Sequence, residues 1–203
     1  MRQLAYRALQ KLAVFEVART LTADTAILAT GEQRSEVVRL DKQTLQGFLD
    51  QNQAPGCEPF LERLDEPNLH AFGAILHGRL VSFAWLHEGS AEAGMNYGYH
   101  PGTATAIRLT DDAAFVFHLY TAPEARGQGW MRSVIWKAAK ELLQNRSIRS
   151  FVTTTETINQ PARRALENAG FIDRGAYCRL GVGEWCSGWY PRTSEPIVGF
   201  GGV

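Results

Sequence analysis

The sequence predicts an α/β (α+β) fold in which one central sheet is flanked by helices. Hydrophobic residues make up 45% of the 203 residues, enough for one substantial core. Segments rich in β-branched and aromatic residues alternate with segments of helical periodicity, and Gly, Pro and Asn mark the boundaries between them. No internal repeat is present, so we expect one domain with short additions at its ends.

The N-terminal addition, residues 1–35, is expected to be a helical extension. Met1 to Arg19 has an amphipathic pattern whose early charges are all basic. A membrane-surface or transit-peptide role stays open beside the favoured one, a helix that packs on the domain or on a second subunit. Residues 36–191 form the main domain, and residues 192–203 form a tail without a strong pattern. The apolar side of the helix predicted for Met1 to Arg19 carries Leu4, Ala8, Leu12 and Phe15.

The first half of the chain is predicted to hold short elements. Asp41 can cap a helix that runs to about Asn52, and Pro55-Gly56 closes this region. Gly78 gives His77-Gly78 the geometry of a hairpin turn. The other expected elements are strands at Ala26–Thr30 and Val37–Leu40, helical turns at Phe60–Leu64, and the hairpin strands Leu69–Leu76 and Leu80–His87.

Glu88 to Asp112 is the least regular segment. Glycines alternate in it with Tyr97, Tyr99 and His100, and a loop of this length is usually functional or disordered. The composition of this segment is consistent with a flap that covers a substrate and equally with a surface loop that has no role in binding. The elements that follow are predicted as a central strand Ala114–Thr121, a helix Gly129–Asn145, a strand Ile148–Thr155, a helix Pro161–Ala169 and a hairpin Tyr177–Tyr190.

The composition limits the kinds of partner that the protein is expected to bind. The formal net charge is zero and there is no dense Lys/Arg block, so nucleic acid is not favoured. No apolar run is long enough to span a bilayer, and the cysteines lack the spacing of metal ligands. Cys178 and Cys186 either face each other across a hairpin or stay reduced, and reduced thiols suit a cytoplasmic protein. The N-terminal helix and the Trp185–Trp189 hairpin could form the surface of a homodimer.

The most informative segment runs from Phe115 to Met131. An apolar, aromatic strand leads through a Pro-bounded turn into Arg126-Gly127-Gln128-Gly129 and then directly into a helix. Glycines at such a junction accept positive φ angles, and the first N–H groups of the helix have no partner within it. A phosphate-bearing ligand is the expected occupant. A P-loop is excluded, because Trp130-Met131 stands where Lys and Ser or Thr are required.

A second segment strengthens this interpretation. Asn159 can cap a helix, Pro161 suits its first turn, and Gly170 can end it in the left-handed conformation. The two segments resemble the pyrophosphate loop and the last motif of the GNAT acyltransferase superfamily, and the resemblance covers roughly Val37 to Leu180. The residues at matching offsets are Arg126 and Gly129 in the loop and Asn159, Ala162, Gly170 and Phe171 in the second motif.

The resemblance implies a splayed, mostly antiparallel mixed sheet, with acetyl-CoA or another acyl-CoA as donor, an amine as acceptor and no metal. Backbone N–H groups of the loop would hold the pyrophosphate, and the central strand would pair with the pantetheine. Arg126 is ambiguous, since its guanidinium can meet a phosphate or brace the loop. The expected cofactor-binding residues are Leu119, Tyr120, Thr121, Arg126, Gly127, Gln128, Gly129, Trp130, Met131, Arg132 and Asn159.

Two residues depart from the superfamily pattern. Met131 replaces the last small residue of the loop, and its side chain would crowd the phosphates if it pointed inward. Leu166 replaces the Tyr that commonly protonates the departing thiolate. Tyr120, Tyr177 or a water are the candidate substitutes.

The candidate catalytic residues are Asp112, His118 and Tyr120. Asp112 enters the central strand where related enzymes often place an acidic base, and His118 within it can titrate near neutrality. The alternatives are a solvated turn residue at Asp112 and a hydrogen-bonded core residue at His118. Glu156, just past the next strand, is a third candidate base. The resulting hypothesis is an acetyl-CoA-dependent N-acyltransferase that acts on a primary amine in a ternary complex, and the alternative is a non-catalytic acyl-CoA-binding or regulatory domain.

Overall fold

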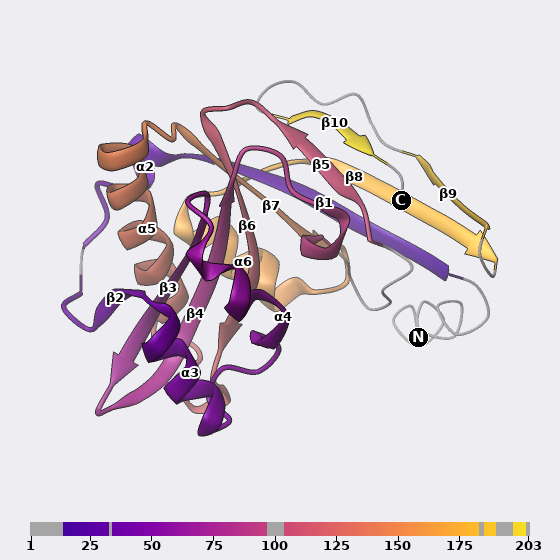
Figure 1. Cartoon of the computed structure of the whole chain (residues 1–203). Helices are drawn as coiled ribbons and strands as arrows, with labels where there is room; N and C mark the ends of the chain where they lie inside the picture. Colours follow the sequence, from indigo (N-terminus) through magenta and orange to yellow (C-terminus); the bar gives the residue numbers. More distant parts are fainter. Residues whose placement is uncertain (1–13, 33, 97–103, 183–184, 190–196, 202–203) are drawn as a thin grey trace.

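The structure, a computed structural model, describes residues 14–32, 34–96, 104–182, 185–189 and 197–201 (Figure 1). In this part of the chain, one sheet holds eight strands in the order β2-β3-β4-β6-β7-β1-β8-β9, and β5 and β10 form a second sheet. The strands are β1 Val14–Asp24, β2 Val37–Leu40, β3 Leu69–Leu76, β4 Arg79–Glu88, β5 Ala106–Leu109, β6 Ala113–Thr121, β7 Ser150–Glu156, β8 Ile172–Val182, β9 Trp185–Trp189 and β10 Ile197–Gly201.

Helices cover both faces of the main sheet. One hydrophobic cluster joins α2, α5 and α6 to strand residues such as Phe72 and Val116, and the other joins α3 and α4 to strand residues such as Trp85 and Phe117. The sheet is therefore the middle of three layers. The helices are α2 Thr25–Leu28, α3 Lys42–Asp50, α4 Glu58–Leu61, α5 Trp130–Arg146 and α6 Gln160–Ala169, with 3-10 turns η1 Glu62–Asp65, η2 Ala93–Met95 and η4 Pro123–Ala125.

Local sequence signals explain where several elements begin and end. The Asp41 carboxylate accepts from the backbone N–H of Thr44 at 2.7 Å and caps α3, as predicted. Asn159 caps α6 in the same way, and Gly170 ends that helix at φ 112°. The β3–β4 turn places His77 at φ 50° and Gly78 at φ 76°, which confirms the predicted hairpin.

The sheet splays open between β6 and β7. These two strands pair in parallel only from Ala113 to Val116. Farther along, the register between β4 and β6 shifts, so that the two residues His118 and Leu119 oppose the single residue Ala84. His118 sits in this bulge with φ 47°. The bulge bends β6 away from β7, and the β7-facing edge of Phe117–Thr121 is left unpaired with β7. The expected splayed, mostly antiparallel sheet is confirmed.

The predicted N-terminal helix is wrong for Val14 to Arg19. These residues belong to β1, which lies between β7 and β8 and pairs antiparallel with both (Figure 1). Val14, Val17 and the threonines that follow are β-branched, and main-chain partners on both sides favour the strand over a weak helical pattern. Within the described residues, the N-terminal part of the chain is thus integral to the sheet. The rest of the predicted helix lies outside the described residues.

Two smaller expectations are corrected, and the alternative left open for Cys178 and Cys186 is decided. Ala26–Thr30 is not a strand, because Asp24 caps the short helix α2 at Ala26. The segment between β4 and β6 contains a strand, β5, whose antiparallel partner is β10 in the C-terminal tail. Its aromatic residues Tyr97, Tyr99 and His100 lie outside the described residues. The β8–β9 register sets Trp189 opposite Cys178 and Gly181 opposite Cys186, so the two cysteines do not face each other.

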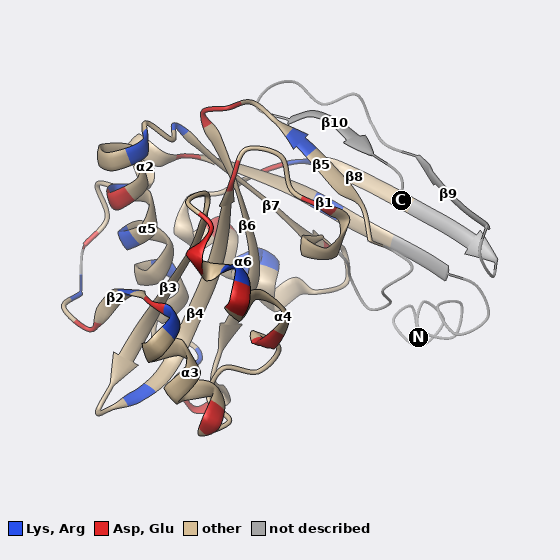
Figure 2. Cartoon of the chain, viewed as in Figure 1, with Lys and Arg blue, Asp and Glu red and all other residues tan. Residues whose placement is uncertain are grey.

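Lys and Arg are interspersed with Asp and Glu over the described elements (Figure 2). No helix in the described ranges has the length and apolar character needed to cross a membrane.

Candidate active site

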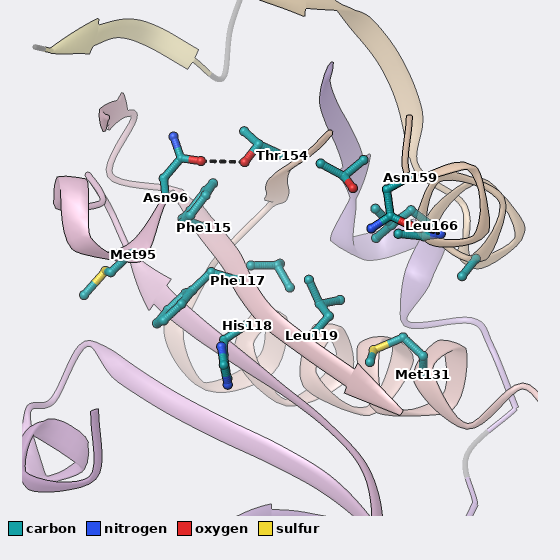
Figure 3. A pocket seen from close by; sticks show the side chains of 14 residues that line it. Met95, Asn96, Phe115, Phe117, His118, Leu119, Met131, Thr154, Asn159 and Leu166 are labelled. Atoms are coloured by element: carbon teal, nitrogen blue, oxygen red, sulfur yellow. Dashed lines mark hydrogen bonds between the residues drawn. The ribbon is translucent and has the colours of Figure 1, made fainter. Parts of the chain in front are cut away.

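Two adjoining cavities follow the second half of β6. The smaller, about 210 Å³, lies in the splay and is lined by Phe117, His118 and Leu119 of β6 and by Thr154 and Thr155 of β7. The larger, about 630 Å³, lies over the segment that joins β6 to α5. Figure 3 shows the smaller cavity, with Met131 and Leu166 on its other walls. Leu119, Met131, Ala162 and Ala165 line both cavities, so the two adjoin along these residues.

The floor of the larger cavity is shaped for an anion. Gly127 at φ 76° and Gly129 at φ 79° turn the chain into α5, whose N-cap Gly129 offers no side chain to the free backbone N–H groups. Three arginines, Arg126, Arg132 and Arg164, line this cavity, and no acidic residue is among its described lining. Helix dipole, free N–H groups and guanidinium groups together favour phosphate oxygens. This cavity floor therefore suits a phosphate-bearing ligand.

Hydrogen bonds within the loop fix its shape. Arg126 Nε donates to the carbonyl of Thr121 at 3.2 Å, so this arginine braces the loop and keeps its outer nitrogens near the cavity. The Gln128 amide nitrogen donates to the carbonyl of Glu124 at 3.0 Å, and its oxygen accepts from Trp130 Nε1 at 3.2 Å. The loop is therefore held in place without a ligand.

The unpaired edge of β6 leads from this loop into the splay. Leu119, Tyr120 and Thr121 all line the larger cavity. Ser82 of β4 donates to the carbonyl of Tyr120 at 3.0 Å and shares a hydrogen bond with Thr121 Oγ1 at 2.9 Å, which fixes the strand from its other edge. Main-chain groups of Leu119–Thr121 have no partner in β7 and can pair with an extended ligand, except the Thr121 carbonyl, which accepts from Arg126.

His118 is the one titratable side chain among the described residues of the smaller cavity. Its Nε2 lies 2.9 Å from the carbonyl oxygen of Pro55, and its ring stacks on Phe83 at 5.6 Å. A carbonyl can only accept, so Nε2 carries a proton and donates it to Pro55. The positive φ of a residue with a Cβ, at 47°, is a strained conformation that such sites commonly hold.

Comparison with known proteins supplies the family. A family model described as the acetyltransferase (GNAT) family matches residues 36–171, more than half of the chain. The chain belongs to the GNAT family. The two motifs at Arg126–Gly129 and Asn159–Phe171 both lie inside the matched range, so the resemblance predicted from them is confirmed.

Solved GNAT structures share this fold at low sequence identity. A GNAT-family structure from Novosphingobium aromaticivorans is 18% identical with a TM-score of 0.51, and the match covers 82% of this chain and 64% of that one. A GCN5-related N-acetyltransferase from Kribbella flavida is 16% identical with a TM-score of 0.52, covering 88% and 63%. This chain thus spans less than two thirds of the length of either. A search of curated protein sequences found no match.

The two departures from the GNAT pattern both lie on the cavity wall. Met131 is partly buried against the core and also lines both cavities. Leu166 is 3% exposed and lines the smaller cavity, where the usual Tyr would place a hydroxyl. Asn159 lines this cavity too, but its side chain accepts from Ala162 N and so is used as a helix cap.

The structure does not bring Asp112 to the GNAT site. Asp112 is an exposed turn residue before β6, and its backbone carbonyl accepts from Arg149 and Ser150. His118 lies six positions farther along the chain, roughly 20 Å at the usual rise of a strand. It lines neither cavity, and the solvated-turn alternative is the one the geometry favours. Glu156, at the end of β7, lines neither cavity either.

Tyr120 and Tyr177 are placed very differently. Tyr120 lines the larger cavity, and its ring stacks on Phe83 at 5.3 Å. Tyr177 is 1% exposed, and its hydroxyl donates to Asn96 Oδ1 at 3.4 Å. The same oxygen accepts from Thr154 Oγ1 at 2.6 Å (Figure 3), so Tyr177 belongs to a buried polar network. Of the two, only Tyr120 borders a cavity.

Sequence reasoning missed two groups of residues at this site. Asn96 and Thr154 line the smaller cavity as a hydrogen-bonded pair that joins η2 to β7. Arg34, from the connection between β1 and β2, contacts the loop at Gln128 and Trp130. No local signal marks either group, because both depend on contacts between segments far apart in the chain.

Proposed function

We propose that this protein is an acetyl-CoA-dependent N-acetyltransferase that transfers the acetyl group to a primary amine by direct attack in a ternary complex. The observation that carries the proposal is that an anion-binding helix N-terminus adjoins the opened edge of β6, with a cavity along each. One ligand with a pyrophosphate, an extended arm and a small reactive end would occupy both cavities. Acetyl-CoA has this shape and supplies an acetyl group activated as a thioester.

The chain's own groups divide the binding between them. Backbone N–H groups from Gln128 to Arg132 and the arginines of the larger cavity hold the pyrophosphate. The open edge of β6 at Leu119–Thr121 pairs with the pantetheine arm. A backbone N–H at the bulge polarises the thioester carbonyl, an interaction worth several kcal/mol where a reaction depends on it.

Proton transfer is assigned to His118 and Tyr120. An alkylammonium near pKa 10.4 must lose a proton at a cost of roughly 4–5 kcal/mol at neutral pH. His118 Nδ1 can accept this proton because Nε2 is already committed to Pro55. The nitrogen–carbon bond then forms as the carbon–sulfur bond breaks, and Tyr120 delivers a proton to the sulfur in place of the missing Tyr at Leu166. The second proton that the amine nitrogen loses as it becomes an amide restores the Tyr120 hydroxyl.

Calorimetry with acetyl-CoA tests the binding half of the proposal. Gly129→Glu puts a carboxylate and a strained φ of 79° into the loop, and we expect it to abolish micromolar binding. Gly47→Glu is the matched control, because a Cβ at Gly47 of α3 meets nothing within 4 Å. Equal binding by wild type and Gly129→Glu, or none by wild type, would contradict the proposed site.

Turnover separates the enzyme from the alternative, a non-catalytic acyl-CoA-binding or regulatory domain. An amine screen that detects the free thiol of CoA should find acceptors for the wild type. Tight acetyl-CoA binding with no acetylated product from any amine would favour the alternative.

A further inference from the structure

The connection between β1 and β2 reaches the phosphate loop from outside the cavity. β3, β4, β6 and β7 separate these two strands in the sheet, so residues 25–36 must cross the face that carries α5. The crossing follows α5 closely (Figure 1). At Gly31, a Cβ would lie only 2.0 Å from a ring carbon of Trp136.

Arg34 is the residue of this crossing that meets the loop. The central carbon of its guanidinium lies 4.5 Å from the centroid of the Trp130 ring. Its Nη2 donates to the backbone carbonyl of Gln128 at 3.3 Å. The same nitrogen is 3.8 Å from the point where a Cβ on Gly129 would lie. One planar group therefore contacts Gln128 and Trp130, the two residues on either side of Gly129.

These contacts act on the part of the loop whose backbone has the most conformational freedom. Gly127 and Gly129 both have positive φ angles, and glycine has the most conformational freedom to lose when it is ordered. The hydrogen bonds of Gln128 and Trp130 side chains are made within the loop and its flanking turn, whereas Arg34 ties the loop to a separate segment. A loop that is already ordered loses less entropy when its ligand binds.

We propose that Arg34 is a positioning residue, which orders the Gln128–Trp130 backbone for acetyl-CoA through one hydrogen bond and one cation–π contact. The inference rests on the proposed function, because acetyl-CoA is the ligand whose affinity the ordered loop sets. Arg34 lines neither cavity, so it acts through the loop. Arg132 differs: it stacks on Trp136 at 4.8 Å and lines the larger cavity itself.

A positioning role for Arg34 and a role that depends only on its charge predict different results for Arg34→Lys. Arginine offers a flat, forked group that stacks and donates at once, whereas the compact ammonium of lysine keeps only the charge. If Arg34 acts by position, Arg34→Lys behaves much like Arg34→Ala, and the loss persists at high salt. A role limited to long-range attraction of the phosphates would be restored by Lys and screened by salt.

The first measurement is hydrogen exchange on the ligand-free protein, which does not depend on acetyl-CoA. In Arg34→Ala and Arg34→Lys, the backbone amides of residues 127–133 should exchange about fivefold faster than in wild type. Arg108→Ala removes an equally positive side chain from an exposed position on β5 and should change nothing there. Exchange rates for the loop that are equal in wild type and Arg34→Ala would overturn the inference.

The second measurement is the Kd for acetyl-CoA by calorimetry, beside kcat at saturating acetyl-CoA. Arg34→Ala and Arg34→Lys should bind about five- to tenfold more weakly, with kcat within about twofold of wild type. An affinity equal to wild type, or full recovery in Arg34→Lys, would overturn the inference. A wild-type protein that binds no acetyl-CoA would instead overturn the proposed function, and the exchange result would still judge the Arg34 contact.

Discussion

The guanidinium of Arg39 donates to Nδ1 of His70, with Nη2 and Nδ1 2.6 Å apart. A guanidinium has no acceptor, so the fully buried imidazole is neutral and carries its proton on Nε2. That nitrogen faces the carboxylate of Glu88 at 2.6 Å. Burial lowers the pKa of His70, the charges of Arg39 and Arg146 lower it further, and Glu88 opposes the change. Arg39 also donates to Glu141, which links this network to α5.

This network predicts that the protein loses stability in mild acid. The pKa of His87 is also lowered, by burial first and by Arg63 next. Both rings bind protons more readily in the unfolded chain, whose His pKa is about 6.5. The contribution of the two neutral rings to the free energy of unfolding is therefore complete above about pH 6.5. Below that pH it falls by up to about 1.4 kcal/mol per pH unit for each ring. The free energy of unfolding in urea, measured from pH 8 to pH 5, checks this.

His70→Gln isolates one of the two rings. Gln can still accept from Arg39 and donate to Glu88 but does not titrate, so the slope below pH 6.5 should be about halved. The control is His77→Asn at the exposed β3–β4 turn, where φ is 50° and Asn is tolerated; its slope should match wild type. An unfolding free energy equal at pH 8 and pH 5 in the wild type would refute the prediction.

His118→Asn should separate the two candidate bases. Asn tolerates the left-handed conformation at this position but cannot accept the proton of the amine. We expect kcat to fall about 10²- to 10⁴-fold with little change in acetyl-CoA affinity. Asp112→Asn should leave kcat within about twofold, because Asp112 is remote from both cavities. If steady-state kinetics showed the large loss of kcat in Asp112→Asn and not in His118→Asn, Asp112 would be the base and His118 would not.

Two tyrosine variants test the source of the thiolate's proton. Tyr120→Phe should lower kcat about 10²-fold or more, since it removes the one hydroxyl we assign to that step. Tyr177→Phe should leave kcat nearly unchanged and cost about 1 kcal/mol of stability, because its hydroxyl serves the buried Asn96 network. Thermal unfolding measured beside kcat distinguishes the two effects, and a kcat loss confined to Tyr177→Phe would reverse the assignment.

Alanine at two glycines should have opposite effects on stability. In Gly31→Ala, the new methyl meets the Trp136 ring at 2.0 Å, and the crossing must shift at a cost of about 3 kcal/mol. In Gly47→Ala, the methyl meets nothing, and removing glycine from the middle of α3 should stabilise by about 0.5–1 kcal/mol. Urea unfolding of both variants checks the pair. A Gly31→Ala protein as stable as wild type would mean that the crossing does not pack on Trp136.

Sequence reasoning predicted the elements whose signals are local. The α6 helix is bounded by Asn159 and Gly170, and the loop glycines Gly127 and Gly129 adopt the positive φ angles expected of them. These features depend on residues a few positions apart, so a short window of sequence contains the whole cause.

The features that were missed depend on distant segments. β1 is a strand because β7 and β8 offer it main-chain partners, and β5 pairs with β10 near the other end of the chain. His118 donates from Nε2 to Pro55, which comes from the α3–α4 connection. No pattern inside Val14–Asp24 or around His118 records those partners, and tertiary context overrides weak local propensity.

The position of β1 has a consequence for how the protein is made. Ala18 pairs with Glu156 of β7 on one side and with Tyr177 of β8 on the other. The first described strand, β1, therefore cannot form these main-chain hydrogen bonds until β7 and β8 have been synthesised. At roughly 5–20 residues per second, a ribosome needs about 7 to 30 s to travel from Ala18 to Glu156. During that interval the exposed strand is open to chaperones and to mispairing with other nascent chains. Slow translation downstream of β1 would prolong this exposure, and the yield of active protein in cells should depend on it.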